Sequence, residues 1–289
     1  MKLLLKAIIL LCCLTQSLTA KVSNTNNPFT IMPHHENFLL FAGYSPNNLT
    51  EKHWSPNGDR DYKKDYKRDT NEAQFQISFK LPLYENIFNE NANLFIAYTQ
   101  NSFWQVYNRE HSKPFRETNY MPELFVEWNP NKKIGFSTLQ KIRLSLAHQS
   151  NGQDIGASRS WNRTQLHLLF QNNNFSYGVD IWDRWDERSK HSLSDPKGDD
   201  NPHLEEYIGR QKYFIAYATD NYKLSLTHQN DIFDYHSSKG NTKVDFIFPS
   251  MHENFDFFIR YFNGYGESLI DYDVKIQRVS FGIIVADWE

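Results

Sequence analysis

Three side chains that together could carry out acyl transfer lie close together in the sequence. His148 and Ser150 are two residues apart, and Asn162 follows after a short polar loop. A serine hydroxyl attacks an acyl carbon when a base takes its proton, and a histidine is an effective base when its second ring nitrogen is held. Because the amide oxygen of Asn162 can hold that nitrogen, the three residue types suit a serine hydrolase.

Two alternating segments must position these side chains. Residues 141–150 and 160–171 both alternate apolar and polar residues, which is typical of strands whose side chains point to opposite faces in turn. His148 and Ser150 share the apolar face of the first segment, and Asn162 shares the apolar face of the second. An apolar face that carries a nucleophile makes sense when it looks toward lipid, so we expect the site on the outside of a barrel, at the edge of the bilayer.

The loop between the two segments is rich in oxygen atoms and glycine. Its polar members are of the kind that Ca²⁺ accepts as ligands, and an oxyanion formed at Ser150 would need such stabilisation. The same residues are also ordinary turn formers, and Asp154 by itself fits a turn better than a metal site. The candidate oxygen donors and glycines of this loop are Gly152, Asp154, Gly156, Ser158 and Ser160.

The composition agrees with a barrel in an outer membrane. Of the 289 residues 16% are aromatic, both cysteines fall within the first 20 residues, and no later stretch is long and apolar enough for a membrane helix. Without Lys2 and Lys6, 29 basic residues face 34 acidic ones, a net charge of −5, so no basic surface for nucleic acid is indicated. A soluble β-sandwich would show the same alternation and stays an alternative.

The first residues predict export. Lys2 and Lys6 precede an apolar run that ends at Leu14, and small and polar residues follow up to Ala20, so we expect a signal peptide over residues 1–20. Residues 21–36 lack periodicity, and we expect a periplasmic leader or a plug-like segment there. One domain, a transmembrane barrel, is predicted over residues 37–289.

Twelve alternating segments predict the strands of that barrel. The connectors after even-numbered segments are mostly short and those after odd-numbered ones are mostly long, as in outer-membrane barrels, whose long loops face outward from the cell. The predicted strands are 37–45, 73–83, 93–107, 121–128, 141–150, 160–171, 174–185, 207–219, 221–231, 242–249, 254–264 and 275–288.

Longer motifs resemble the outer-membrane phospholipase A family. HQSNG begins at His148, and SRSWNR begins at Ser158. Further blocks in the order of that family are YTQ at 98–100, PFRETNY at 114–120, DDNP at 199–202 and GYGESLIDY at 264–272. The resemblance covers residues 73–288. It implies a 12-stranded antiparallel transmembrane β-barrel that is a Ca²⁺-dependent esterase, acts on phospholipids and lysophospholipids, and is activated as a homodimer in the outer membrane.

The resemblance also implies roles for single residues. Ser150 matches the nucleophile, His148 the general base and Asn162 the orienting amide. Calcium ligands match Ser158 and the backbone carbonyl of Gln153.

Three further positions bear on calcium and on the dimer. Ser112 matches a calcium ligand that the second copy donates across the dimer. Asp200 keeps its counterpart at a second calcium site, where Ile155 replaces an aspartate, so that site depends on whether Asp154 substitutes. Gln100 resembles a polar residue at the dimer seam and shares its face with apolar neighbours.

We therefore expect a serine phospholipase A1/A2 in the outer membrane. The alternative is a non-catalytic barrel, porin-like or adhesive, because inward arginines such as Arg143, Arg163, Arg260 and Arg278 would also suit a polar lumen. For the segment 264–272 we expect packing rather than catalysis.

Overall fold

The structure is a computed structural model that describes most of the chain. The described residues are 30–46, 69–87, 91–109, 113–154, 157–192, 195, 197–232, 239–252 and 254–286. The expected signal peptide, Ser112, Ile155 and the last three residues lie outside them. None of the described helices is long and apolar enough to cross a membrane.

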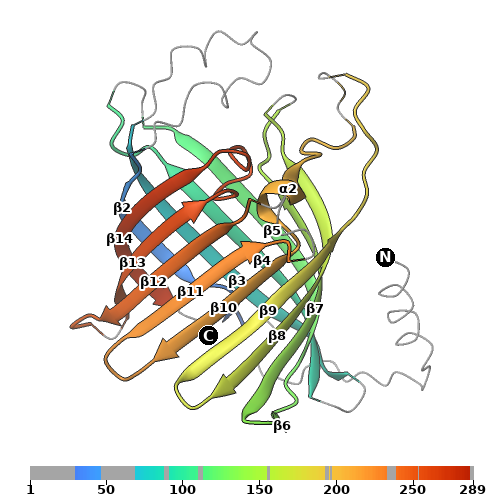
Figure 1. Cartoon of the computed structure of the whole chain (residues 1–289), viewed down its shortest axis with the longest axis vertical. Helices are drawn as coiled ribbons and strands as arrows, with labels where there is room; N and C mark the ends of the chain where they lie inside the picture. The colour runs from blue at the N-terminus through green and yellow to red at the C-terminus, as the bar shows by residue number, and fades with distance from the viewer. Residues whose placement is uncertain are drawn as a thin grey trace.

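Twelve long antiparallel strands close into a barrel, as predicted (Figure 1). Each strand pairs with its neighbours in the chain, and β14 returns to pair with β2, so the sheet has no free edge. The strands are β2 (Asn37–Tyr44), β3 (Asn71–Ile87), β4 (Ala92–Trp104), β5 (Phe115–Trp128), β7 (Ser137–Ser150), β8 (Ser160–Asn172), β9 (Phe175–Arg184), β10 (Gln211–Ala218), β11 (Lys223–Asn230), β12 (Asn241–Pro249), β13 (Asp256–Gly264) and β14 (Ile276–Ala286).

Among the described residues, three short elements accompany the barrel. β1 (Met32–Pro33) pairs with β3, and β6 (Lys132–Ile134) pairs with β7. The helix α2 (Leu204–Ile208) lies at the end of the barrel that carries the long loops (Figure 1).

Several predicted strand boundaries differ from the structure by a few residues, and two of these differences have a clear cause. The strand expected from Tyr207 begins only at Gln211, because residues 204–208 form α2 and Gly209 ends it with a φ of 67°. A Cβ at Gly209 would lie 1.9 Å from the backbone of Asn230, so only glycine allows this close approach. The strand expected from Met121 begins already at Phe115, within a segment that reads as a loop because its polar side chains face the interior.

The faces of the strands are sorted as the alternation predicted. Large apolar side chains are exposed on the outside, where a bilayer would cover them, and most of the inward positions are polar and buried. The exposed apolar set includes Leu39, Phe41, Ile77, Ile96, Leu124, Leu146, Ile181, Ile215, Leu224, Leu226, Phe246, Ile259, Val279 and Phe281.

Ion pairs and hydrogen bonds between strands cross-link the interior. Arg116 of β5 binds both carboxylate oxygens of Glu72 at 2.8 and 3.0 Å. Glu127 binds Lys80 at 2.9 Å and Arg143 at 3.3 Å. Because these buried charges are paired between strands, the side chains of the lumen stiffen the barrel.

The segment before β2 enters the barrel. Residues 32 and 33 pair with β3, and His34 is buried against Glu123 of β5. Residues 30–36 are the described part of the expected periplasmic leader. Their backbone and side-chain contacts hold them against the inner wall as a plug. Residues 21–29 lie outside the described residues.

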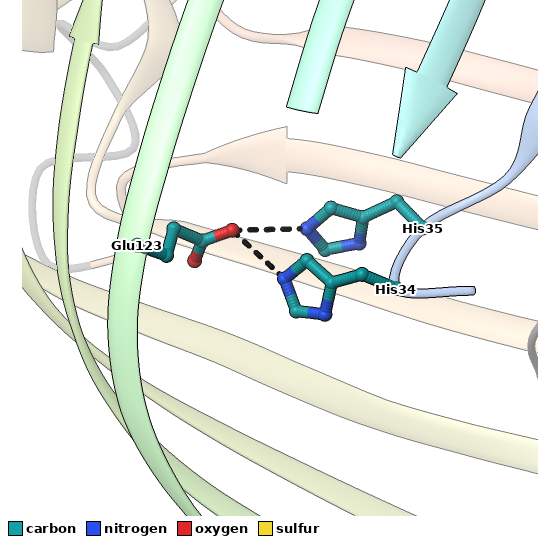
Figure 2. Close-up of side chains that lie close together, drawn as sticks. All are labelled: His34, His35 and Glu123. Carbon is teal, nitrogen blue, oxygen red and sulfur yellow. Dashed lines mark hydrogen bonds and ion pairs between the residues drawn. The ribbon is translucent and has the colours of Figure 1, made fainter. Parts of the chain in front are cut away.

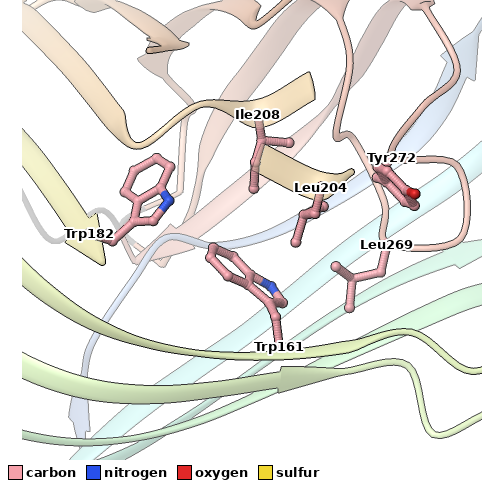
Figure 3. Close-up of a cluster of buried hydrophobic side chains, with 6 residues drawn as sticks. All are labelled: Trp161, Trp182, Leu204, Ile208, Leu269 and Tyr272. Carbon is pink, nitrogen blue, oxygen red and sulfur yellow. The ribbon is translucent and has the colours of Figure 1, made fainter. Parts of the chain in front are cut away.

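An apolar cluster packs around α2 at the end of β8 and β9 (Figure 3). It joins Trp161 of β8 and Trp182 of β9 to α2 and to the segment 264–272, which confirms the predicted packing role of that segment. Its members are Trp161, Trp182, Leu204, Ile208, Leu269 and Tyr272.

Candidate active site

His148 and Asn162 face each other across the β7–β8 pair. The two residues are direct partners in the antiparallel register, and Nδ1 of His148 lies 2.9 Å from Oδ1 of Asn162. Both side chains point outward, since Ala147 and Arg163, one position away from them, are buried inside. The sequence prediction that both lie on the outer, apolar face is therefore confirmed.

Ser150 is the last residue of β7 and lies on the same face as His148. It pairs with Ser160 of β8 and with Tyr120 of β5, so neighbours hold its backbone on both sides. Its Oγ makes no hydrogen bond to any other described side chain. Because Nδ1 of His148 is engaged by Asn162, Nε2 is the ring nitrogen that is not used in this contact.

Asn151 fixes the loop that follows Ser150. Its Oδ1 accepts from the backbone N–H of Arg159 at 2.9 Å, and its Nδ2 donates to the carbonyl of Ala157 at 2.9 Å. The side chain is 2% exposed and also reaches Glu117 of β5. The loop is thus folded back on the residue after Ser150. The sequence reasoning missed this role of Asn151, although an asparagine at the start of a loop favours such turns.

The inner face of the same strands is held rigid. Nε1 of Trp161 donates to Oε1 of Gln149 at 3.1 Å, and the guanidinium of Arg163 stacks over the Trp161 ring at 4.1 Å. A barrel wall that is packed on the inside keeps His148 and Asn162 in place on the outside.

Acidic side chains gather beside Ser158. Its hydroxyl donates to Oδ2 of Asp200 at 2.8 Å, and Lys190 forms an ion pair with the other oxygen of Asp200. Asp199 is bound by Arg184 at 2.6 Å. Two of the predicted calcium ligands, Ser158 and Asp200, are therefore in contact.

Glu187 joins this group, although no motif or spacing in the sequence points to it. Its Oε1 is buried without a hydrogen-bond partner among the described residues. Burial raises the pKa of Glu187, and the carboxylates of Asp199 and then Asp200 raise it further, while Arg184 and His148 lower it. The carboxyl group of Glu187 therefore interacts electrostatically with Asp199, Asp200 and the imidazole of His148.

The remaining positions that were predicted to bear on calcium or on the dimer are Gln153, Ser112, Ile155 and Gln100. Gln153 is exposed in the loop, with its backbone N–H 3.4 Å from Oδ1 of Asn151. Ser112 and Ile155 lie outside the described residues. Gln100 lies on the outer face of β4, where it bonds Tyr98 at 3.2 Å and Ser102 at 3.1 Å.

The profile of the family described as phospholipase A1 matches residues 14–285. The chain belongs to the phospholipase A1 family. Among its relatives, phospholipase A1 of Proteus vulgaris is 33% identical over 265 residues, which cover 91% of this chain and 83% of that protein. Phospholipase A1 of Escherichia coli strain K12 is 31% identical over the same shares of the two chains.

Solved structures of phospholipase A1 relatives have the same fold. Outer membrane phospholipase A from Escherichia coli matches with a TM-score of 0.79 at 30% identity, over 92% of this chain and 95% of that one. The calcium-bound dimer of the Salmonella typhi outer membrane phospholipase matches with a TM-score of 0.78 at 30% identity, over 91% and 95% of the two chains. This phospholipase A1 family member is an outer-membrane β-barrel, and a soluble β-sandwich is excluded.

Proposed function

We propose that this barrel is a serine hydrolase that releases fatty acids from phospholipids at the outer-membrane surface. The observation that carries the proposal is the 2.9 Å contact between His148 and Asn162 on the lipid-facing side, with Ser150 on the same face of the same strand. A solved structure of the Escherichia coli relative is an active-site variant in which an asparagine is replaced by alanine, which supports a catalytic role for an asparagine.

In this mechanism Ser150 Oγ attacks the ester carbonyl while Nε2 of His148 takes its proton. Because an amide oxygen only accepts, Asn162 selects the imidazole tautomer with the proton on Nδ1 and leaves Nε2 as the base. The imidazolium then gives its proton to the departing alcohol, the lysophospholipid. Water, deprotonated by His148, releases the fatty acid from Ser150.

The described residues fit a calcium ion next to this site. The hydroxyl of Ser158, the carboxylate of Asp200 and the buried oxygen of Glu187 are hard oxygen donors of the kind that Ca²⁺ prefers. Ser158, the carbonyl of Gln153 and Ser112 of a second copy would hold the ion, with Asp200 at a neighbouring position. When bound, the ion would polarise the ester carbonyl and stabilise the oxyanion.

The proposal includes a homodimer as the active form. Gln100 is a polar side chain on the outer face of β4, which it shares with the exposed Ile96. Such a position is unfavourable in lipid and favourable against a second polar side chain, as at a dimer seam. Two barrels side by side would form an acyl groove and take phospholipids at sn-1 and sn-2 as well as lysophospholipids.

Calcium-dependent release of fatty acid from mixed micelles tests the proposal. We expect Ser150→Ala to lose at least about 10³-fold of the rate while the barrel stays folded, because the nucleophile alone is removed. Heat-modifiable migration on a gel controls for folding. Equal rates in the variant would contradict the proposal and favour a non-catalytic barrel. The ion pairs that cross the lumen argue against an open porin.

A further inference from the structure

Inside the barrel, on the face away from Ser150, two imidazoles and one carboxylate converge (Figure 2). His34 and His35 come from the segment before β2, and Glu123 comes from β5. Nε2 of His34 lies 2.9 Å and Nε2 of His35 lies 3.4 Å from the same oxygen, Oε2 of Glu123. All three ligand atoms lie within 4.8 Å of one another.

We propose that His34, His35 and Glu123 form a binding site for a transition-metal ion of the zinc class. Imidazole nitrogens with one carboxylate oxygen are a donor set that zinc accepts, with bonds of about 2.0–2.1 Å, so ligand atoms around a tetrahedral ion lie about 3.4 Å apart. The separations of 2.9 and 3.4 Å need only small side-chain shifts to admit such an ion.

The charge balance of the site favours a metal ion. Glu123 is 5% exposed, and among the described side chains only the two histidines pair with it. Glu127, further along β5, has Lys80 and Arg143 instead. A buried carboxylate needs a positive partner, and two protonated imidazoles with ring centroids 4.1 Å apart would repel each other. A divalent ion between neutral rings meets both requirements.

The rings are held in place for this role. The ring of His34 stacks on Phe125 with 4.9 Å between centroids and an interplanar angle of 14°. Its Nδ1 is buried without a partner among the described residues, so Nε2 is the only nitrogen that orients the ring. The backbone N–H of His35 is fixed by Ser78 at 3.0 Å.

An ion can reach the cluster and complete its coordination. His35 and Glu123 line a polar lumenal cavity of about 300 Å³, together with Gln76, Asn101 and Arg163. Water in this cavity can supply the fourth ligand. Since His34 and Glu123 are 89 residues apart in the sequence, a bound ion would fasten the N-terminal segment to the barrel wall.

Cobalt(II) titration of the full-length barrel, folded in detergent and carrying no histidine tag, tests the site. After removal of metals with a chelator, we expect one equivalent of cobalt to give the visible absorption of a tetrahedral site, and zinc to displace it. Affinity should fall at least about 100-fold in both His34→Gln and Glu123→Gln. His167 and Asp180, 2.7 Å apart, are another buried His–carboxylate pair in the same lumen. His167→Gln should therefore leave the affinity for cobalt unchanged.

Two further measurements make the result unambiguous. Zinc should raise the unfolding temperature of the original chain and of His167→Gln, but not of His35→Gln, and heat-modifiable migration shows that each variant is folded. Excess calcium should leave the cobalt spectrum unchanged, because nitrogen ligands disfavour it. Absence of cobalt binding, displacement by calcium, or full binding in His34→Gln and Glu123→Gln would each overturn the proposal.

Discussion

The contact between His148 and Asn162 depends on the strand register. In an antiparallel pair, residues directly opposite have side chains on the same face and close together. Their partnership in the register therefore brings the imidazole and the amide together without any loop. Trp185 also bonds the backbone carbonyl of Asn162 at 2.9 Å, which fixes β8 on its other side.

The hydrogen-bonding atom of Asn162 can be tested by two substitutions. We expect Asn162→Ala to lower the rate of fatty-acid release about five-fold, because one neutral hydrogen bond is worth about 1 kcal/mol. Asn162→Asp keeps an accepting oxygen and should keep most of the rate. If the aspartate variant were as slow as the alanine variant, Asn162 would not act by orienting the imidazole.

Glu187 should make stability depend on pH. Because its pKa is raised in the folded chain by burial and then by Asp199, ionisation costs folding free energy once the pH exceeds the ordinary value for glutamate, about 4.3. In the presence of a chelator, Glu187→Gln should therefore stabilise the barrel at pH 7 by up to about 0.5 kcal/mol after solvent screening, and the gain should vanish below about pH 4. Urea midpoints at the two pH values measure this, and an equal gain at both would contradict it.

At the scale of elements, the loop after β13 is tied to the barrel wall by charge. Arg116 of β5 binds Glu72 of β3 and forms an ion pair with Asp271, and it also donates to Ser268 at 3.2 Å. All four side chains are buried. The segment 264–272 thereby becomes a structural part of the wall beneath the apolar cluster of Figure 3.

Removal of Arg116 should be costly. Arg116→Met leaves the buried carboxylates of Glu72 and Asp271 without their main partner, and we expect a loss of about 3–5 kcal/mol in the free energy of unfolding. Arg210→Met is the matched control, because Arg210 is 45% exposed in its pair with Asp231 and should cost at most about 1 kcal/mol. Urea unfolding in lipid vesicles compares the two, and similar losses would contradict the role given to Arg116.

At the scale of the whole molecule, the barrel sorts its chemistry by face. Ser150, His148 and Asn162 look outward toward lipid, while the ion pairs and the histidine cluster fill the inside. Because the outer face is mostly apolar, a polar side chain such as Gln100 can contribute strongly to association with a second barrel.

Dimerisation should respond to Gln100. We expect Gln100→Leu to weaken calcium-dependent crosslinking in micelles by about 1 kcal/mol, or roughly five-fold, because a hydrogen bond between barrels is lost. Fatty-acid release at low protein concentration should fall with it. His228 lies on the outer face of β11, halfway round the barrel from β4, so His228→Leu should leave the dimer intact. If His228→Leu weakened crosslinking as much as Gln100→Leu, the seam would not be specific.

The sequence alone determined the parity of the strands. Period-two alternation identifies which side chains share a face, so the twelve strands and the outward placement of His148, Ser150 and Asn162 could be predicted. The start of β5 and the helix α2 could not, because inward polar residues such as Arg116 resemble a loop until their buried partners are known.

Only the tertiary structure decided which distant groups meet. His34 and Glu123, or Ser158 and Asp200, are far apart in the chain, and their proximity follows from barrel closure and loop packing rather than from any local pattern. Alternation fixes the direction of a side chain relative to its own strand, whereas contacts across the lumen depend on the register and closure of all twelve strands.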